Sequence, residues 1–253
     1  MPERGGPQAI PRPDSWAPGR PAPWSALPAD RLAPTPDRVR EVFPAGHRGR
    51  PSPVAAEGGT PSAVLVPLYE DEREGGLHVV LTRRDWNLRT HRGEVSFPGG
   101  RAEPGEDARR TALREACEEV DIDPDSVEAL GELDHLTTVT RRAYIVPVVG
   151  LLPGSPELRP NAGEVDEVLR VPLAELLRDD VFREERWGTP DMSRPVYFFE
   201  LVGDTVWGAT AAMLRQMLAL LTGADPGSLE DLDPARGTPP GFRLSPDEER
   251  SVF

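Results

Sequence analysis

Residues 99–120 constrain the fold most, because they join a glycine-rich turn to a helix whose two sides differ in chemistry. The turn begins with two adjacent glycines, and the helix is predicted over 106–120. On a helical wheel, the acidic side chains fall within an arc of about 100°. They are Glu115, Glu118 and Glu119, opposite the apolar Leu113, Ala116, Cys117 and Val120. The pattern therefore predicts a helix that packs one side against a core and presents carboxylates from the other.

The segments around this helix indicate short strands and a few further helices. Because the strands neither alternate regularly with helices nor form an all-β series, they predict an α/β fold with a mixed β-sheet flanked by helices. The predicted strands are 63–69, 77–82, 94–97, 129–137, 144–152, 167–171, 196–202 and 205–207, and the further helices are 35–43, 172–177 and 208–223.

The distribution of proline predicts three regions. The chain holds 30 prolines, concentrated near its two ends, where apolar periodicity is also weakest. Residues 1–59 are predicted to be a partly disordered, proline-rich extension with one short helix, and residues 224–253 a flexible tail. Residues 60–223 are predicted to form the single folded domain, and the ends that lie outside about residues 30–224 are expected to contribute few core contacts.

The charge of the chain excludes several classes of function. A net charge of −14 disfavours a nucleic-acid groove, which needs a dense positive surface. All 29 basic residues are arginines, so a P-loop lysine is excluded.

The sequence shows neither a signal peptide nor an apolar run long enough to cross a membrane. The single Cys117 cannot form an intrachain disulfide, which fits a cytoplasmic location.

Like charges side by side on a helix repel, so the three glutamates need an explanation. A bound divalent cation would turn the repulsion into attraction, since Mg²⁺ prefers oxygen ligands and is commonly held by a few carboxylates together with substrate phosphates. The alternative is a solvated acidic helix face.

The wider spacing distinguishes these alternatives. The segment reads G-x5-E-x7-R-E-x2-E-E, and this pattern resembles the Nudix box of hydrolases that cleave nucleoside diphosphates linked to another moiety. The resemblance implies an α/β/α sandwich with a loop–helix–loop box that binds Mg²⁺ or Mn²⁺. The residues that fill the pattern are Gly100, Glu106, Arg114, Glu115, Glu118 and Glu119.

The resemblance also implies roles for single residues. Glu115, Glu118, Glu119 and the Gly99 carbonyl are the implied metal ligands, and Arg114 is expected to orient a glutamate. Glu118, Glu119 and Arg114 are also the expected catalytic residues. Glu164, in a later loop, is a further candidate metal ligand or general base. An ordinary surface-loop position is an equally weighted alternative for Glu164. Asp121 stands where the family has a glycine, and Asp adopts the left-handed helix end better than most residues.

Residues 80–100, VLTRRDWNLRTHRGEVSFPGG, resemble the motif that precedes the box in the coenzyme A diphosphatase branch of the family. The resemblance implies cleavage of coenzyme A to 3′,5′-ADP and 4′-phosphopantetheine. Asp85 departs from the motif by replacing a small residue. The expected substrate contacts are Arg83, Arg84, Arg89 and His91, since arginine forks match phosphate oxygens.

Two other readings stay open at this point. The chain could hydrolyse a different nucleoside diphosphate derivative, such as NADH, ADP-ribose or a nucleotide sugar, or it could be a non-catalytic Nudix-fold regulator that binds nucleotides. The sequence also leaves open the preferred metal, the general base, acylated or oxidised coenzyme A as substrate, and the oligomeric state, a homodimer included.

Overall fold

The computed structural model describes residues 3–53, 60–138 and 143–228. The helices are α1 (Pro36–Val42), α2 (Ala108–Val120), α3 (Leu173–Leu176) and α4 (Gly208–Thr222), with 3-10 turns at Ala29–Leu32 and Pro124–Ser126. The strands are β1 (Trp16–Pro18), β2 (Thr60–Glu70), β3 (Leu77–Arg84), β4 (Val95–Ser96), β5 (Gly99–Arg101), β6 (Glu128–Glu132), β7 (Leu136–Thr137), β8 (Ala143–Leu151), β9 (Val165–Pro172), β10 (Phe182–Thr189), β11 (Met192–Glu200) and β12 (Thr205–Trp207).

The larger of two sheets is mixed, as the sequence predicted. Its main path runs β4-β3-β2-β8-β6, while β5, β7 and β9 pair with β2, β8 and β3. The central strands β2 and β8 are parallel, and the other strand pairs of this sheet are antiparallel. The β2–β8 pair therefore requires a long crossover connection, and α2 lies in it.

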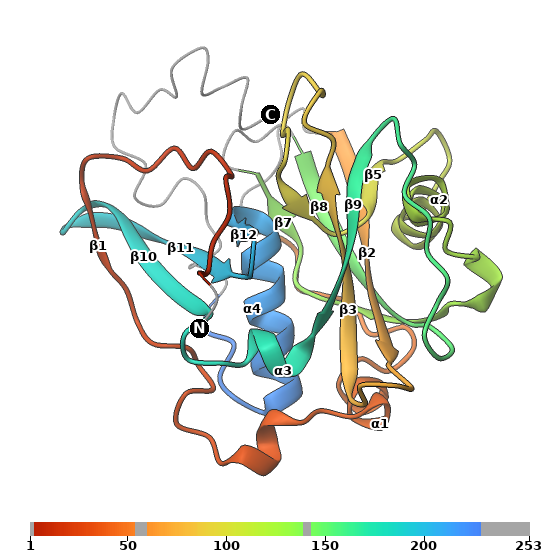
Figure 1. The fold of residues 1–253 in the computed structure, drawn as a ribbon, viewed down its shortest axis with the longest axis horizontal. Coiled ribbons are helices and arrows are strands. Elements are labelled where there is room, and N and C mark those ends of the chain that lie inside the picture. The colour runs from red at the N-terminus through yellow and green to blue at the C-terminus, as the bar shows by residue number, and fades with distance from the viewer. Residues whose placement is uncertain (1–2, 54–59, 139–142, 229–253) are drawn as a thin grey trace.

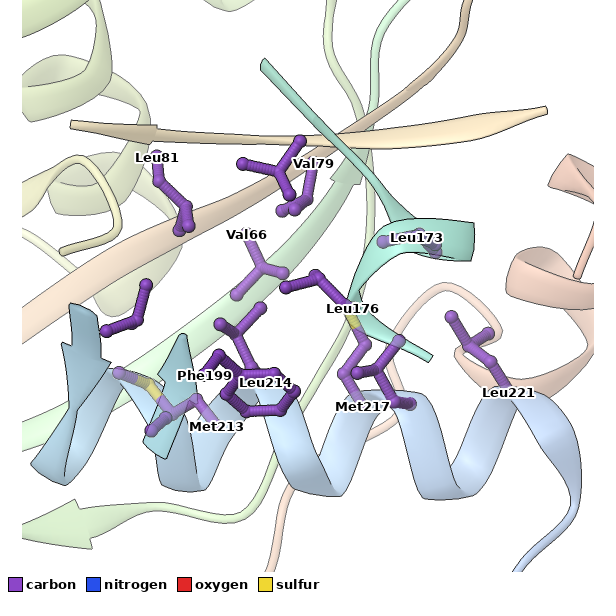
Figure 2. Packing of buried hydrophobic residues seen from close by; sticks show 14 of the residues in the cluster. Val66, Val79, Leu81, Leu173, Leu176, Phe199, Met213, Leu214, Met217 and Leu221 are labelled. Carbon is purple, nitrogen blue, oxygen red and sulfur yellow. The ribbon is translucent and has the colours of Figure 1, made fainter. Parts of the chain in front are cut away.

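Helices cover both faces of this sheet, which confirms the α/β/α sandwich (Figure 1). Successive strand residues point to opposite faces, so alternate positions of β2 enter different cores. Leu65 packs with Ala116 and Val120 of α2. Val66 packs on the other face, toward Leu214 and other apolar residues of α4 (Figure 2).

A second sheet, in the order β1-β10-β11-β12, lies beside α4. The sequence predicted β11 and β12 but not β10. The reason is that Glu184 and Glu185 are buried in β10, so the strand lacks an apolar pattern. Arg12 and Arg183 form ion pairs with Glu185, which compensates for burying its charge.

The prediction that the residues before about 30 add few core contacts is wrong, because Ala22 and Trp24 lie in the core. Trp24 is fully buried, stacks against Phe199 and meets Phe182 edge to face. Its indole nitrogen donates a hydrogen bond to the Leu177 carbonyl at 3.1 Å. The predicted helix is present as α1, capped by the Thr35 hydroxyl. Because the segment is fixed by isolated anchors and not by a repeating apolar pattern, its sequence indicated disorder.

The C-terminal prediction lies largely outside the described residues. Residues 224–228 are described, and they contact α4 through the Arg215 guanidinium, which donates to the Pro226 carbonyl at 2.7 Å. In the described ranges, none of the helices has the length and apolar character needed to cross a membrane.

Trp24→Ala tests whether the N-terminal segment is part of the core. We expect a loss of about 3–5 kcal/mol in the free energy of unfolding, because a fully buried tryptophan leaves a large cavity. Trp16→Ala, at a side chain that is 43% exposed, is the control and should cost less than about 1 kcal/mol. Urea unfolding of both variants measures the difference, and equal values would place Trp24 outside the core.

Candidate active site

The glycine turn lies where the sheet divides. Strands β2 and β3 pair only through residues 68–70 and 77–79, and β4 and β5 occupy the space beyond. A Cβ atom on Gly99 would lie 2.5 Å from the Ala63 carbonyl oxygen, and one on Gly100 would lie 2.5 Å from the Glu115 carboxylate. The two glycines therefore let the turn approach β2 and leave room for a carboxylate from α2.

Helix α2 begins two residues later than predicted and ends as expected. The Asp107 side chain accepts a hydrogen bond from the Arg110 amide and caps the helix. Asp121 takes the left-handed conformation, with φ 62°, and its amide donates to the Cys117 carbonyl at 3.0 Å. The substitution of the family's glycine by Asp121 thus leaves the helix end intact.

Arg114 is the centre of an ion-pair cluster on the acidic side of α2. Its guanidinium donates to Glu106 at 2.9 Å, to Glu115 at 3.0 Å and to Glu118 at 3.1 Å. It also donates to the Arg101 carbonyl at 2.9 Å. The bond from Arg114 lowers the pKa of Glu106 to about 2. Arg114 is therefore placed to orient Glu115.

Glu106 fills a position of the predicted box, but the sequence analysis assigned it no role in the site. Its carboxylate is the anchor for Arg114, and it also accepts a bond from the Thr111 hydroxyl at 3.0 Å. The structure shows this role: Glu106 holds the arginine that contacts Glu115 and Glu118. The fixed spacing between Glu106 and Arg114 was the signal available.

Glu119 is buried, contrary to the expectation that all three glutamates face outward. It is 4% exposed, and its Oε2 atom accepts a hydrogen bond from the Gly99 amide at 3.2 Å. Burial raises the pKa of Glu119 to about 7, although the charge of Arg84 and the Gly99 bond act in the opposite direction. The turn at Gly99 passes over the helix, which is why a residue on the polar side is covered.

Glu164 joins this group from a distant part of the chain. The loop at 159–164 is held against the end of α2 by the Asn161 amide, which donates to the Glu119 carbonyl at 2.8 Å. The charge of Glu164 raises the pKa of both Glu115 and Glu119, although burial is the largest cause in each case. Glu118 is more open, with 57% of its side chain exposed. The structure thus gathers Glu115, Glu119 and Glu164 and leaves Glu118 at the rim.

Arg84 faces this carboxylate group. Its charge lowers the pKa of Glu119, and its Nε atom is buried without a hydrogen-bond partner among the described residues. A buried polar atom without a partner is costly, so an arriving acceptor would be favoured there. Arg84 is therefore placed to bind an anion beside the carboxylates.

Arg83 does not have the role that the sequence suggested. It donates to Asp166 at 2.8 Å, to Asp204 at 2.9 Å and to Glu167. The structure places Arg83 in an ion-pair network that ties β3 to β9 and to the turn before β12, instead of leaving it open to a phosphate. Adjacent residues of a strand point to opposite faces, so Arg83 and Arg84 could not both face the site.

The other predicted substrate contacts lie in the loop between β3 and β4. Arg89 is exposed, and His91 has a positive φ of 54° with its Nδ1 atom 2.8 Å from Glu94. The Asp85 carboxylate accepts from the Asn87 amide at 2.6 Å, and the Asp85 amide donates to the Glu164 carbonyl at 2.9 Å. Asp85 thus forms part of the loop's own turn and joins the loop to Glu164.

The acidic group is suited to a divalent cation, although it is not preassembled. Within the ranges described, no three acidic, histidine or cysteine side chains are already arranged as a metal site. Arg114 and the Gly99 amide instead satisfy Glu115 and Glu119. These carboxylates repel each other and Glu164, and a cation between them would remove that repulsion.

Comparison with known proteins agrees with this geometry. The NUDIX domain family matches residues 59–190, just over half of the chain. The chain belongs to the Nudix family. The match includes the glycine turn, α2 and the loop that carries Glu164.

Named relatives are similar over the same region. The chain is 36% identical to Nudix hydrolase 15, mitochondrial, of Arabidopsis thaliana over 67% of its own length and 61% of that protein. It is 37% identical to the uncharacterized Nudix hydrolase NudL of Photorhabdus laumondii over 62% of its own length and 82% of that protein. Nudix hydrolase 3 of Caenorhabditis elegans is also 37% identical, over 63% and 72% of the two lengths. The chain therefore spans less than two thirds of the Arabidopsis relative.

Proposed function

We propose that this protein hydrolyses the diphosphate bond of coenzyme A, with Mg²⁺ or Mn²⁺ bound, to give 3′,5′-ADP and 4′-phosphopantetheine. The observation that supports hydrolysis of a diphosphate is the juxtaposition of buried Glu119 with Arg84, whose buried Nε atom has no hydrogen-bond partner among the described residues. Carboxylates that suit a cation and an arginine that suits an anion lie side by side, and a metal-bound diphosphate needs both. The relatives named as hydrolases support turnover over mere nucleotide binding.

The chain's own residues divide the work. Glu115 and Glu119, with Glu118 at the rim, would hold the metal, which neutralises phosphate oxygens and lowers the pKa of an attacking water. Arg114 orients Glu115 and Glu118 through its two hydrogen bonds. Arg84 binds the diphosphate, and Glu164 lies on the loop side as the candidate general base.

The choice of coenzyme A depends on the loop between β3 and β4. Residues 80–100 resemble the motif of the coenzyme A diphosphatase branch, apart from Asp85, and exposed Arg89 is available for a substrate phosphate. Arg83 no longer supports this choice, because three carboxylates occupy its guanidinium. The second candidate is a nucleoside diphosphate derivative without a 3′-phosphate, such as NADH or ADP-ribose, because Arg84 and the carboxylates would serve any diphosphate.

Glu119→Gln tests the hydrolase assignment. We expect kcat to fall by at least about two orders of magnitude, because the change removes a charged metal ligand. The melting temperature should stay equal or rise, since a neutral amide is less costly to bury than a carboxylate. Glu41→Gln, on the exposed side of α1, is the control and should match wild type. Turnover near the wild-type rate at saturating Mg²⁺ would remove Glu119 from the site.

Comparison of coenzyme A with 3′-dephospho-coenzyme A tests the substrate. We expect kcat/KM to be about tenfold higher for coenzyme A, because one charge-assisted contact to the 3′-phosphate contributes about 1.5–3 kcal/mol. Arg89→Ala should reduce that ratio, whereas Arg73→Ala, in the exposed turn between β2 and β3, should not. NADH cleaved as efficiently as coenzyme A would leave only the broader diphosphohydrolase assignment.

A further inference from the structure

The N-terminal segment reaches the loop between β3 and β4 through a single buried side chain. Gln8 is 7% exposed, and its amide nitrogen donates to the Gly93 carbonyl at 2.9 Å and to the Asp204 carboxylate at 2.8 Å. Its amide oxygen accepts from the Thr205 backbone amide at 2.8 Å. One side chain thus joins three segments that are far apart in the sequence: the N-terminal extension, the loop before β4, and β12.

The backbone around Gln8 is fitted closely to the turn before β12. Gly6 donates from its amide to the Thr205 hydroxyl at 3.0 Å, and a Cβ atom on Gly6 would lie 2.5 Å from the Gly203 carbonyl oxygen. The Gly5 amide donates to the Leu201 carbonyl at 2.7 Å. These contacts attach the backbone just before Gln8 to the turn at 203–204. They therefore restrict the position of Gln8 independently of its contact with the loop.

The contact with Gly93 lies at the base of the loop. Gly93 donates from its amide to the Arg84 carbonyl at 3.1 Å, and the Arg84 amide donates to the Glu94 carbonyl at 2.9 Å. The Trp86 ring packs on Gly93 so closely that a Cβ atom there would lie 2.2 Å from it. Gln8 therefore hydrogen-bonds to Gly93, the residue that contacts both the Trp86 ring and the backbone of Arg84.

The contact with Asp204 leads to the same strand. Asp204 is buried and accepts from Arg83 as well as from Gln8. Arg83 precedes Arg84 directly in β3, so the position of one constrains the other. Two hydrogen-bonded paths, one through Gly93 and one through Asp204, thus run from Gln8 to the strand end that carries Arg84.

We propose that Gln8 is a positioning residue for substrate binding, which fixes the loop between β3 and β4 and the direction of Arg84. This inference rests on the proposed function in assigning Arg84 and Arg89 to the substrate. A residue that places binding groups without joining the chemistry affects KM more than kcat. The N-terminal extension then supports the loop between β3 and β4 from behind, through Gln8.

Gln8→Met tests this role, because methionine fills a similar volume but has no donor for Gly93 and Asp204 and only a weak sulfur acceptor for the Thr205 amide. We expect KM for coenzyme A to rise about tenfold while kcat stays within about twofold of wild type. Arg4→Ala is the matched control from the same segment. It removes bonds to Glu175 and Asp180 but does not contact the loop, so KM should not change.

A second readout does not depend on activity. Arg89 and Arg92 are exposed in the loop, and trypsin cleaves after arginine where the backbone can open. We expect Gln8→Met to speed cleavage at these two sites about tenfold at a temperature where circular dichroism shows the variant folded, and Arg4→Ala to leave the rate unchanged.

The outcomes separate this inference from the proposed function. The positioning role is overturned if trypsin cleaves Gln8→Met at the wild-type rate and the variant hydrolyses coenzyme A with wild-type kcat and KM. It is also overturned if kcat falls while KM stays the same. If wild type hydrolyses no diphosphate at all, the proposed function fails, and the trypsin rates alone then decide whether Gln8 holds the loop.

Discussion

The hydrogen bond from the Gly99 amide to the buried Glu119 carboxylate is the contact on which the rest of the site depends. It requires β5 to pass over α2, which in turn requires glycine at both positions of the turn, since a side chain at either would collide with β2 or with Glu115. The divided sheet supplies the space for that turn, because β2 and β3 separate beyond their first three pairs. The close approach of the Gly99–Gly100 turn to β2 and α2 therefore determines both the local fold and the geometry of the site.

Two arginines, Arg84 and Arg114, only partly compensate the negative charges of the glutamates around this contact. The positive charge of Arg84 acts on Glu119, whereas Arg114 is shared among Glu106, Glu115 and Glu118. Glu164 adds a further negative charge from the facing loop. Burial raises the pKa of Glu115 and Glu119, and the charge of Glu164 raises both further. A divalent cation carries the charge that such a group lacks.

The sequence predicted the elements whose side chains repeat with a clear period. The strands around 63–69 and 77–82 and the helix around 208–223 are present because their apolar positions match the two faces of one sheet. Strand β10 was missed, since buried, ion-paired glutamates hide its pattern. The N-terminal segment was missed for a related reason: Trp24 and Gln8 fix it singly, through contacts that have no period.

The sequence likewise predicted only part of the candidate site. The spacing from Gly100 to Glu119 predicted which residues come together, because a turn followed by a helix fixes their relative positions locally. It could not predict that Glu119 is covered or that Asp166, Glu167 and Asp204 occupy Arg83, because those contacts come from segments far along the chain. Long-range contacts, and not local propensity, decide which arginine faces the carboxylates of α2.

The central claim is that the acidic face of α2, under the Gly99 turn, binds a divalent cation. Mn²⁺ titration followed by electron paramagnetic resonance of the free ion tests it most directly, with wild type, Glu115→Gln and the control Glu74→Gln in the exposed turn between β2 and β3. We expect Glu115→Gln to weaken Mn²⁺ binding by at least about tenfold, because a charged ligand is lost, and Glu74→Gln to bind like wild type. Equal Mn²⁺ affinity for all three proteins, or no binding by wild type, would contradict the claim.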